Sequence, residues 1–188
     1  MGRQKEKPKA LATPEKVIAV RLRTLAQKEE IIIFFQRLIG LLVLLVVIFG
    51  LLFGMAPMRN GDMAPRISAG DLMLYYRLEQ NFRAQDVIIF EKEGVSYTGR
   101  IVARGGDTVE ITEDATLVVN GSTVWENEIY YTTPQYESDV KYPIALNSDE
   151  VFVLCDYREG AKDSRYFGPV RRDEIKGKVI TVIRRSSL

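Results

Sequence analysis

The sequence contains no histidine, which excludes Ser-His-Asp and Cys-His catalytic machinery and every metal site with histidine ligands. It contains a single cysteine, Cys155, so the chain can form neither an internal disulfide nor a cysteine-rich zinc site. Cys155 directly follows the apolar run 151–154. We therefore expect a small buried side chain at this position rather than a reactive thiol.

The sequence also lacks a net excess of charge of one sign, because 26 Lys and Arg residues oppose 25 Asp and Glu residues. The distribution is uneven, however. Residues 1–58 contain nine basic and four acidic side chains, whereas residues 59–188 contain seventeen and twenty-one. Because the larger part is acidic, the basic end is not a general nucleic-acid signal, and no nucleic-acid partner is expected.

One stretch, residues 38–58, lacks charge altogether between Arg37 and Arg59. As a helix its 21 residues would extend about 32 Å, which matches the roughly 30 Å hydrocarbon core of a bilayer. A cleaved signal peptide has a shorter apolar region, and no small-residue cleavage pattern follows here. We therefore predict a basic tail and helix at 1–37, a transmembrane helix at 38–58 and an extracytoplasmic domain at 59–188.

Basic residues before this stretch predict its direction. They are Arg3, Lys5, Lys7, Lys9, Lys16, Arg21, Arg23, Lys28 and Arg37. By the positive-inside rule, the N-terminus is expected in the cytoplasm and the C-terminal domain outside a single-pass cell-membrane anchor. Thr13-Pro14 has the pattern of an N-cap followed by proline at the first helical position, so we expect the helix to begin there.

Beyond Arg59 the apolar residues recur with the period of strands. Short runs rich in Val, Ile, Tyr and Thr predict strands at 71–78, 86–92, 95–104, 108–112, 116–119, 123–126, 150–154 and 177–184. Asn120-Gly121 is a strong hairpin signal between two of these runs. Because no helices alternate with the strands, the pattern predicts a mainly β fold: an antiparallel, barrel-like domain after one N-terminal transmembrane helix.

The strand pattern fades between residues 129 and 148, where Tyr130, Tyr131, Tyr136 and Tyr142 occur. A tyrosine combines apolar area with a hydroxyl and is therefore a good contact residue. These four residues are a candidate partner surface. The alternative interpretation is that they only cover the edge of the β domain.

Four sequence blocks follow the apolar stretch in a fixed order. They are Met63-Ala64-Pro65 with Gly70-Asp71; the run 86–90; the run 97–102 with Gly106-Asp107 and Asn120-Gly121; and the run 152–156 with 163–168 and 175–178. Together they resemble the type I signal peptidases, the S26 serine peptidases, from the anchor to the C-terminus. The resemblance implies that family's fold, a membrane helix followed by an antiparallel β domain.

The resemblance also implies where the chemistry would lie. The family uses a serine that attacks the peptide carbonyl and a desolvated, neutral lysine that takes the serine's proton. This sequence has Asp62 at the nucleophile position, Gly99 at the base position and Ala161 where a further serine would orient the lysine. Since losing nucleophile or base costs on the order of a millionfold in rate, about 8 kcal/mol, the resemblance implies a pseudoenzyme.

Other positions carried over by the resemblance would serve binding or structure. The peptide- or partner-binding groove would contain Asn60, Asp62, Met63, Pro65, Tyr97 and Gly99. Asp163 and Arg165 resemble the family's structural ion pair beside the groove. No cofactor is implied, and nothing motivates a metal site on Asp62, Asp156 and Asp163. Within an active enzyme, a rewired dyad built on Lys92 with Ser68 or Ser96 is the alternative.

A groove without the dyad can still bind, because strand addition needs only backbone hydrogen bonds and apolar pockets. Signal-peptidase-like proteins with Asp for Ser and Gly for Lys are known from Gram-positive pilus operons as chaperone-like accessory factors for sortase-driven pilin polymerisation. The resemblance implies such a factor, with pilin or the pilus sortase as partner and no small-molecule substrate. Two alternatives remain: an active signal peptidase with altered catalytic residues, and a regulator of secretion that binds signal peptides without cutting them.

Overall fold

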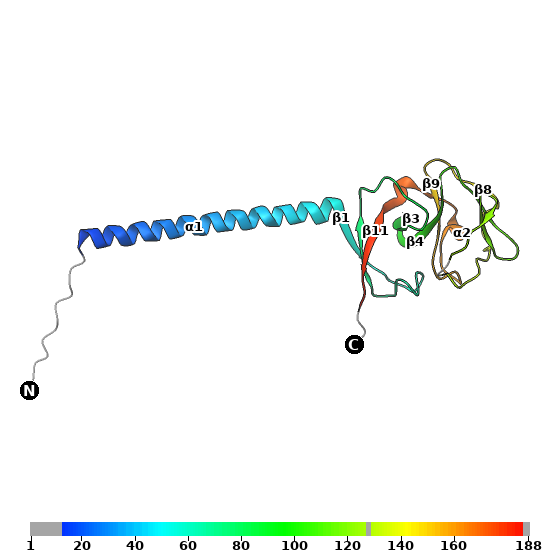
Figure 1. Ribbon diagram of the computed structural model, residues 1–188, viewed down its shortest axis with the longest axis horizontal. Coiled ribbons are helices and arrows are strands. Elements are labelled where there is room, and N and C mark those ends of the chain that lie inside the picture. Colours follow the sequence, from blue (N-terminus) through cyan, green and yellow to red (C-terminus); the bar gives the residue numbers. More distant parts are fainter. Residues whose placement is uncertain (1–12, 127–128, 186–188) are drawn as a thin grey trace, which may run out of the picture. The chain divides into compact units, whose positions relative to one another are not determined.

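The computed structural model describes residues 13–126 and 129–185 of the 188-residue chain. The chain divides into two units. One carries the long helix α1 (Pro14–Val47), and the other, the β unit, begins at Ile48 and carries all the described strands (Figure 1). Of the basic residues used to predict orientation, Arg3, Lys5, Lys7 and Lys9 lie outside the described residues.

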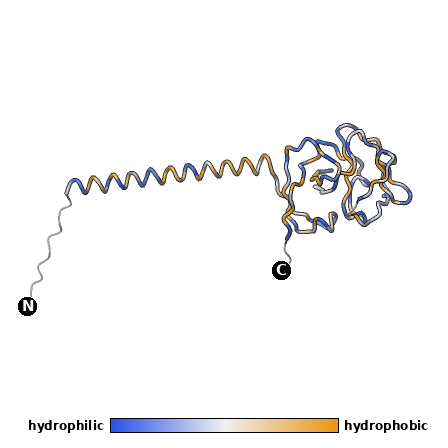
Figure 2. The backbone as a smooth tube through the Cα atoms, in the orientation of Figure 1, coloured by the Kyte–Doolittle hydropathy of each residue, from blue (hydrophilic) through white to orange (hydrophobic). Residues whose placement is uncertain are grey.

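Helix α1 begins at Pro14, as predicted, and the Lys16 backbone N–H donates to the Thr13 carbonyl at 2.9 Å. The helical run continues through one π-helical turn, η1 (Ile48–Leu52). Its polar residues lie mainly in the N-terminal half, and its apolar residues gather in the C-terminal half (Figure 2). Within the described part of the chain, this is the one helix long and apolar enough to cross a membrane.

The helical run ends earlier than the sequence predicted. Residues 53–57 form strand β1 (Phe53–Pro57), which pairs antiparallel with β2 (Leu72–Tyr76), and the Met58 side chain is buried in the core of the β unit. Gly54 packs directly against the Tyr75 ring, a contact that leaves no room for a side chain. The last six residues of the predicted span 38–58 are therefore not helical. The sequence did not reveal this, because uncharged strand residues and uncharged helix residues look alike by hydropathy alone.

The strands form two antiparallel sheets, as predicted for a mainly β fold. The seven-stranded sheet has the order β1-β2-β11-β3-β4-β9-β10, where the further strands are β3 (Val87–Lys92), β4 (Val95–Arg104), β9 (Glu150–Leu154), β10 (Val170–Arg171) and β11 (Ile175–Ile183). The four-stranded sheet has the order β7-β6-β5-β8, with β5 (Thr108–Ile111), β6 (Leu117–Val119), β7 (Ser122–Thr123) and β8 (Ile144–Ala145). Two short helices, α2 (Ser164–Phe167) and η2 (Arg172–Glu174), lie between β9 and β11.

The predicted hairpin is confirmed: Asn120 and Gly121 both have positive φ and connect β6 to β7, with Val119 opposite Ser122. The predicted strand 123–126 is wrong beyond Thr123. The chain leaves the sheet there. The last hydrogen bond to β6 runs from the Val124 backbone N–H to the Leu117 carbonyl. The run has the composition of a strand, but beyond this point β6 offers it no further partner.

The core follows the alternation of the strands. In β5, Val109 and Ile111 point inward and are buried, whereas Glu110 between them is exposed. A second cluster of buried side chains contains Met63, Met73, Ile89, Cys155 and Ala161. Cys155 is 2% exposed, which confirms the expectation of a small buried side chain. This second cluster contains Ala161, one of the positions that the resemblance assigns to the chemistry.

Candidate functional site

The turn that carries Asp62 is tied to the segment following β9, because the Tyr157 backbone N–H donates to the Asp62 carbonyl at 2.8 Å. The Asn60 Nδ2 group donates to Asp62 Oδ2 at 2.6 Å, and the Asp62 N–H donates back to Asn60 Oδ1 at 3.3 Å. Asn60 therefore closes a turn around its neighbour's carboxylate. Hydrogen bonds from an Asn side chain to the residue two positions on are typical of turns.

The Asp62 carboxylate is half-buried, and burial raises its pKa above the usual value, because desolvation disfavours the charged form. The hydrogen bond from Asn60 opposes this shift, and the negative charge of Asp163 adds to it. A carboxylate in this place can accept hydrogen bonds or attract a cation. It has no hydroxyl with which to attack a carbonyl.

Gly99 is buried in the middle of β4, with Ile88 of β3 opposite it. A Cβ atom built at Gly99 would lie 2.5 Å from Val153 Cγ1 and 3.3 Å from the Leu154 carbonyl oxygen. Real Cβ atoms essentially never approach another heavy atom as closely as the first of these distances. The space that a side chain would need at this position is therefore filled by β9.

Ala161 and Cys155 complete the buried side of the site. Ala161 is 2% exposed and belongs to the same cluster as Met63 and Cys155. The Cys155 Sγ atom lies 3.6 Å from the Thr98 carbonyl, beside Gly99. Burial raises the pKa of the Cys155 thiol well above its usual range, and the carboxylates of Asp163 and Asp62 add to the shift. The structure thus brings the three positions of the predicted chemistry around an unreactive thiol.

A buried ion pair holds the backbone next to this site in place. Arg165 and Asp163 are both fully buried and make two parallel contacts, from Nε to Oδ1 at 2.9 Å and from Nη2 to Oδ2 at 2.8 Å. Asp163 Oδ2 also accepts the Cys155 backbone N–H at 3.1 Å, and Oδ1 accepts the Arg165 N–H that opens α2. Both carboxylate oxygens are therefore used in holding β9 and α2 in place.

Two further ion pairs near the site were not identified from the sequence. Arg100 donates to both carboxylate oxygens of Asp156, at 2.8 and 2.6 Å, and Arg158 donates through Nη2 to both oxygens of Glu126, at 2.8 and 2.7 Å. Arg100 is the one charged residue in the buried run 99–103 of β4, which is a signal that a buried partner must exist. Because Asp156 and Asp163 are each bound by an arginine, they do not form a metal-binding cluster with Asp62.

The predicted groove residues do not share one open surface. Met63 is fully buried in the core, and Gly99 presents no side chain. The Tyr97 ring is partly buried and packs against Phe90 and Phe167, with ring centroids 5.7 and 5.4 Å apart. Of the predicted set, Asn60 and Pro65 are exposed, and Asp62 is partly buried like Tyr97.

The four tyrosines also separate into two pairs. Tyr130 is 83% exposed and Tyr131 lies at the surface beside it. Tyr136 instead donates to the Arg158 carbonyl at 2.9 Å and stacks on the Arg165 guanidinium at 4.1 Å. Tyr142 is partly buried against Phe152. Tyr136 and Tyr142 therefore make structural contacts, and Tyr130 and Tyr131 are the exposed members of the candidate partner surface.

Lys92, the lysine considered for a rewired dyad, is occupied elsewhere. Its ammonium group contacts Glu174 Oε2 at 2.7 Å and donates to the Pro169 carbonyl at 3.0 Å. Both contacts engage the ammonium group with residues other than Ser68 and Ser96. These contacts favour a structural role for Lys92.

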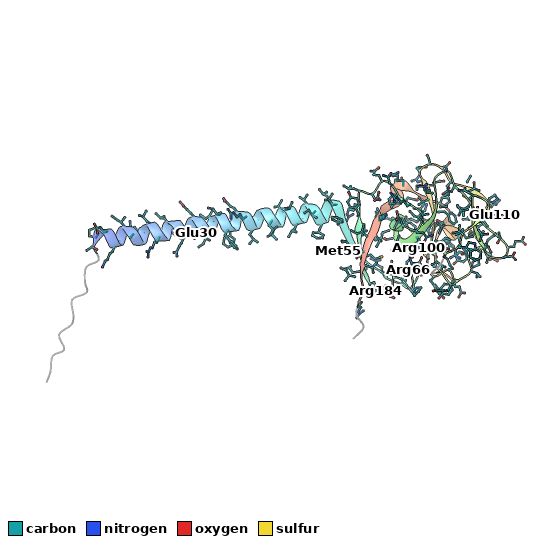
Figure 3. The ribbon with its side chains drawn as sticks, in the orientation of Figure 1. Glu30, Met55, Arg66, Arg100, Glu110 and Arg184 are labelled. Atoms are coloured by element: carbon teal, nitrogen blue, oxygen red, sulfur yellow. The ribbon has the colours of Figure 1, made fainter. Side chains whose placement is uncertain are left out.

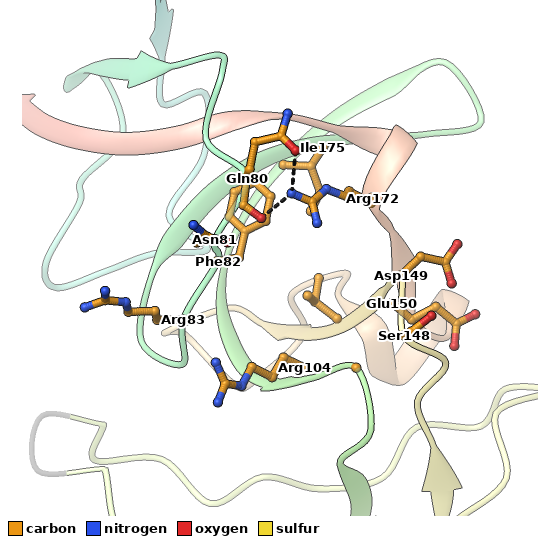
Figure 4. A pocket seen from close by; sticks show the side chains of 12 residues that line it. Gln80, Asn81, Phe82, Arg83, Arg104, Ser148, Asp149, Glu150, Arg172 and Ile175 are labelled. Atoms are coloured by element: carbon orange, nitrogen blue, oxygen red, sulfur yellow. Dashed lines mark hydrogen bonds between the residues drawn. The ribbon is translucent and has the colours of Figure 1, made fainter.

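A separate pocket of about 490 Å³ lies between residues 80–83, the end of β4, the start of β9, and Arg172 with Ile175 (Figure 4). Arg83 and Arg104 stand on one side and Asp149 and Glu150 on the other, while Arg172 donates to the Gln80 side chain at 3.2 Å. None of the residues predicted for the chemistry lines this pocket. Its lining carries both signs of charge and favours no ligand of one sign.

Comparison with known proteins agrees with the resemblance seen in the sequence. Signal peptidase I of Bacillus licheniformis is 26% identical over 152 residues, which cover 74% of this chain and 80% of that protein. Signal peptidase I P of Bacillus subtilis subsp. natto is 32% identical over 109 residues, 52% of this chain and 56% of that protein. The plasmid transfer protein TraF of Escherichia coli is 37% identical over 91 residues, 45% of this chain and 47% of that protein. The similarity to the last two therefore spans only about half of their length.

Among solved structures, a signal peptidase I from Enterococcus faecalis V583 is 26% identical, with a TM-score of 0.46, and covers 54% of this chain and 98% of that one. The family model described as signal peptidase, peptidase S26, matches residues 31–183. That match takes in the C-terminal part of α1 and the whole β unit up to the end of β11. The chain therefore belongs to the signal peptidase family, peptidase S26.

Proposed function

We propose that this protein is a non-catalytic member of the signal peptidase family, and that it works by binding a polypeptide rather than by cutting one. The observation that carries the proposal is the pair of residues at the catalytic positions. Asp62 occupies the position of the nucleophile, and Gly99 occupies the position of the base. The space that a side chain at Gly99 would need is filled by Val153. Neither an attacking hydroxyl nor a neutral amine is available at these two positions.

The carboxylate of Asp62 does not replace the missing groups. It could act as a base toward water, but amide hydrolysis also needs an acid to protonate the leaving amine. The buried Cys155 thiol is a poor acid, because burial raises its pKa well above the usual range. The buried Ser164 hydroxyl accepts the Val153 backbone N–H at 3.0 Å and belongs to the framework. We infer that residual peptide hydrolysis is negligible.

The proposal includes a single membrane anchor formed by the apolar half of α1. Lys16, Arg21, Arg23, Lys28 and Arg37 all precede the apolar stretch. By the positive-inside rule this favours a cytoplasmic N-terminus and a β unit on the outer side of the cell membrane. There the β unit would meet polypeptides that have just been exported.

For the partner, we propose pilin subunits or the sortase that polymerises them, with this protein as a chaperone-like accessory factor in pilus assembly. Support comes from the resemblance to pilus-operon proteins that carry the same Asp and Gly replacements. The relative named plasmid transfer protein TraF is consistent with roles beyond signal-peptide removal in this family. No small-molecule substrate or cofactor is needed for such a role.

Deletion in the source organism tests this role. We expect immunoblots of cell-wall extracts to show monomeric pilin in place of high-molecular-weight ladders, while secretory precursors are processed normally. Expression of the Asp62→Ala variant from a plasmid should restore the ladders. Ladders that persist unchanged after deletion would remove the pilus role. Slowed precursor processing on overexpression would favour the regulator of secretion instead.

A second candidate function is an active signal peptidase with altered chemistry. The names of several relatives favour it, since those from Bacillus licheniformis and Bacillus subtilis subsp. natto are signal peptidases. This candidate requires that purified protein cleave an Ala-x-Ala precursor and that Asp62→Ala abolish the cleavage.

A further inference from the structure

The four-stranded sheet and the loop before β8 form a part of the β unit with a strong charge bias. Residues 108–145 contain seven carboxylate side chains and one lysine, Lys141. Three of the carboxylates, Glu110, Glu113 and Asp114, are exposed, and among the described residues none of them has an ion-pair partner. This region therefore presents unneutralised negative charge to solvent.

Aromatic side chains stand exposed beside these carboxylates. Trp125 is 86% exposed and Tyr130 is 83% exposed. Large exposed aromatic side chains grouped in this way are typical of contact surfaces, where they become the anchors of binding. Tyr131, next to them, is held by an edge-to-face contact with Tyr157, with ring centroids 5.2 Å apart.

A pocket of about 300 Å³ lies between these aromatic residues and the β5–β6 turn. Its lining includes Ala115, Leu117, Val124, Trp125, Tyr130 and Tyr131. Asp114 directly precedes the lining residue Ala115 in the chain. We call this pocket with its rim of Glu113 and Asp114 the acidic aromatic pocket.

The positive charge nearest to this pocket is already neutralised. Glu126 lines the pocket, and both of its carboxylate oxygens accept from Arg158 Nη2. Arg158 is fully buried and also donates to Thr133 Oγ1 at 2.7 Å and to the Cys155 carbonyl at 2.6 Å. Among the described residues of the pocket, no basic side chain is left to meet an incoming ligand.

The acidic aromatic pocket and the catalytic positions have no residue in common. Figure 3 shows Glu110 at the end of the β unit opposite Met55 of β1. Neither Asp62 nor Gly99 lines the pocket. Beside it, β7 is an edge strand of the four-stranded sheet and has β6 as its only neighbour in the sheet order. An edge strand can accept an extended segment of another chain.

From the charge, the aromatic side chains and the edge strand, we propose that the acidic aromatic pocket binds an extended segment of a partner protein that carries lysine or arginine. The cation would lie over the faces of Trp125 and Tyr130 and pair with the carboxylates of Glu113 and Asp114. Anionic partners are repelled by the same carboxylates. The proposal does not depend on the loss of catalysis, because the pocket shares no residue with the catalytic positions.

Trp125 is the only tryptophan of the chain, so its fluorescence reports directly on the pocket. The experiment uses the full-length protein in detergent micelles. An acetylated and amidated peptide of alternating glycine and lysine is titrated in, and a peptide with glutamate in place of lysine serves as the comparison. We expect a saturable change in tryptophan emission with the lysine peptide alone, and a dissociation constant that rises with salt.

Variants assign the binding to the pocket. Glu113→Gln with Asp114→Asn should weaken binding of the lysine peptide about fivefold, and so should Trp125→Ala, read from the anisotropy of a labelled peptide. The matched control is Glu93→Gln with Asp149→Asn, which removes two exposed carboxylates outside the pocket and should leave the dissociation constant unchanged.

Three results would overturn the proposal. One is a tryptophan emission that shows no saturable change with the lysine peptide. Another is equal binding of the glutamate peptide, which would make the pocket a general peptide site. The last is a loss of affinity in the control variant equal to that in the pocket variant, which would reduce the effect to the net charge of the protein.

Discussion

Val153 occupies the space that a side chain at Gly99 would need, since its Cγ1 atom lies 2.5 Å from the ideal Cβ position. The two residues lie on the adjacent strands β4 and β9, and both are buried. A buried β-branched side chain has little freedom to move away. Glycine at position 99 is therefore a requirement of the packing as well as the absence of a base.

This packing predicts that Gly99→Ala destabilises the protein. Overpacking of a well-filled core costs about 1–3 kcal/mol in the free energy of unfolding. Gly61→Ala is the control, because an added Cβ at Gly61 meets nothing within 4 Å. Thermal unfolding of the full-length protein in detergent measures both changes.

A double variant separates this overlap from other effects of the substitution. In the presence of Val153→Ala, the additional cost of Gly99→Ala should largely disappear, so the two changes should be strongly non-additive. Equal costs of Gly99→Ala in both backgrounds would contradict the claim that Val153 fills the position.

The pKa of Asp62 predicts a dependence of stability on pH. Burial raises this pKa above the usual 3.8, so the carboxyl contributes stability at low pH that is lost as the pH rises through the folded-state pKa. Asp62→Asn should therefore raise the melting temperature at pH 7 relative to the wild type. The difference should shrink as the pH falls below about 4.

Asp71 is the matched control with the opposite sign. Backbone N–H groups of Ser68 and Arg185 donate to its carboxylate at 2.9 and 3.0 Å and lower its pKa. The Asp71 carboxylate therefore adds stability at pH values above its unfolded-state pKa, and this stability is lost on acidification. Asp71→Asn should therefore lower the melting temperature at pH 7. If both variants change stability in the same direction, the account of Asp62 is wrong.

The buried pair Arg165–Asp163 is predicted to be essential to the fold. Arg165→Met leaves the Asp163 carboxylate buried without its partner, which costs about 3–5 kcal/mol in the free energy of unfolding. Arg171→Met breaks an ion pair with Asp173 that is mostly exposed, and should cost less than about 1 kcal/mol. Chemical denaturation of the two variants measures the contrast, and equal losses would contradict it.

Removing the hydroxyl of Tyr142 and removing that of Tyr136 should have opposite effects on the free energy of unfolding. The buried Tyr142 hydroxyl has no hydrogen-bond partner among the described residues, so Tyr142→Phe should stabilise the protein by about 1 kcal/mol. The Tyr136 hydroxyl donates to the Arg158 carbonyl and accepts the Gly160 N–H, so Tyr136→Phe should destabilise it by a similar amount. Denaturation curves that rank the two variants in the reverse order would refute this assignment.

Much of the fold could be predicted because local pattern and tertiary pairing agree along most strands. The run 150–154 is a strand with the predicted bounds, and Asn120-Gly121 forms the predicted turn. The predicted bounds are wrong where strand pairing, rather than local sequence, determines the structure. Residues 53–57 are as uncharged as the helix before them, but they pair with β2. Strands of two residues, such as β8 and β10, are too short to carry a period.

For the candidate site, the sequence shows which residues occupy the catalytic positions but not how those residues pack. Asp62, Gly99 and Ala161 are readable directly, but the filling of position 99 by Val153 depends on the register between β4 and β9. Likewise, Tyr136 and Tyr130 are both tyrosines in an irregular segment, and only the tertiary contacts of Tyr136 with Arg158 and Arg165 separate them.

Proteolysis of a secretory precursor by the purified full-length protein in detergent tests the central claim most directly. A precursor with an Ala-x-Ala cleavage site is incubated with the protein, and the products are separated by mass. We predict no cleavage above a control without protein, for the wild type and for Asp62→Ala alike. Turnover at the Ala-x-Ala site that disappears in Asp62→Ala would contradict the account.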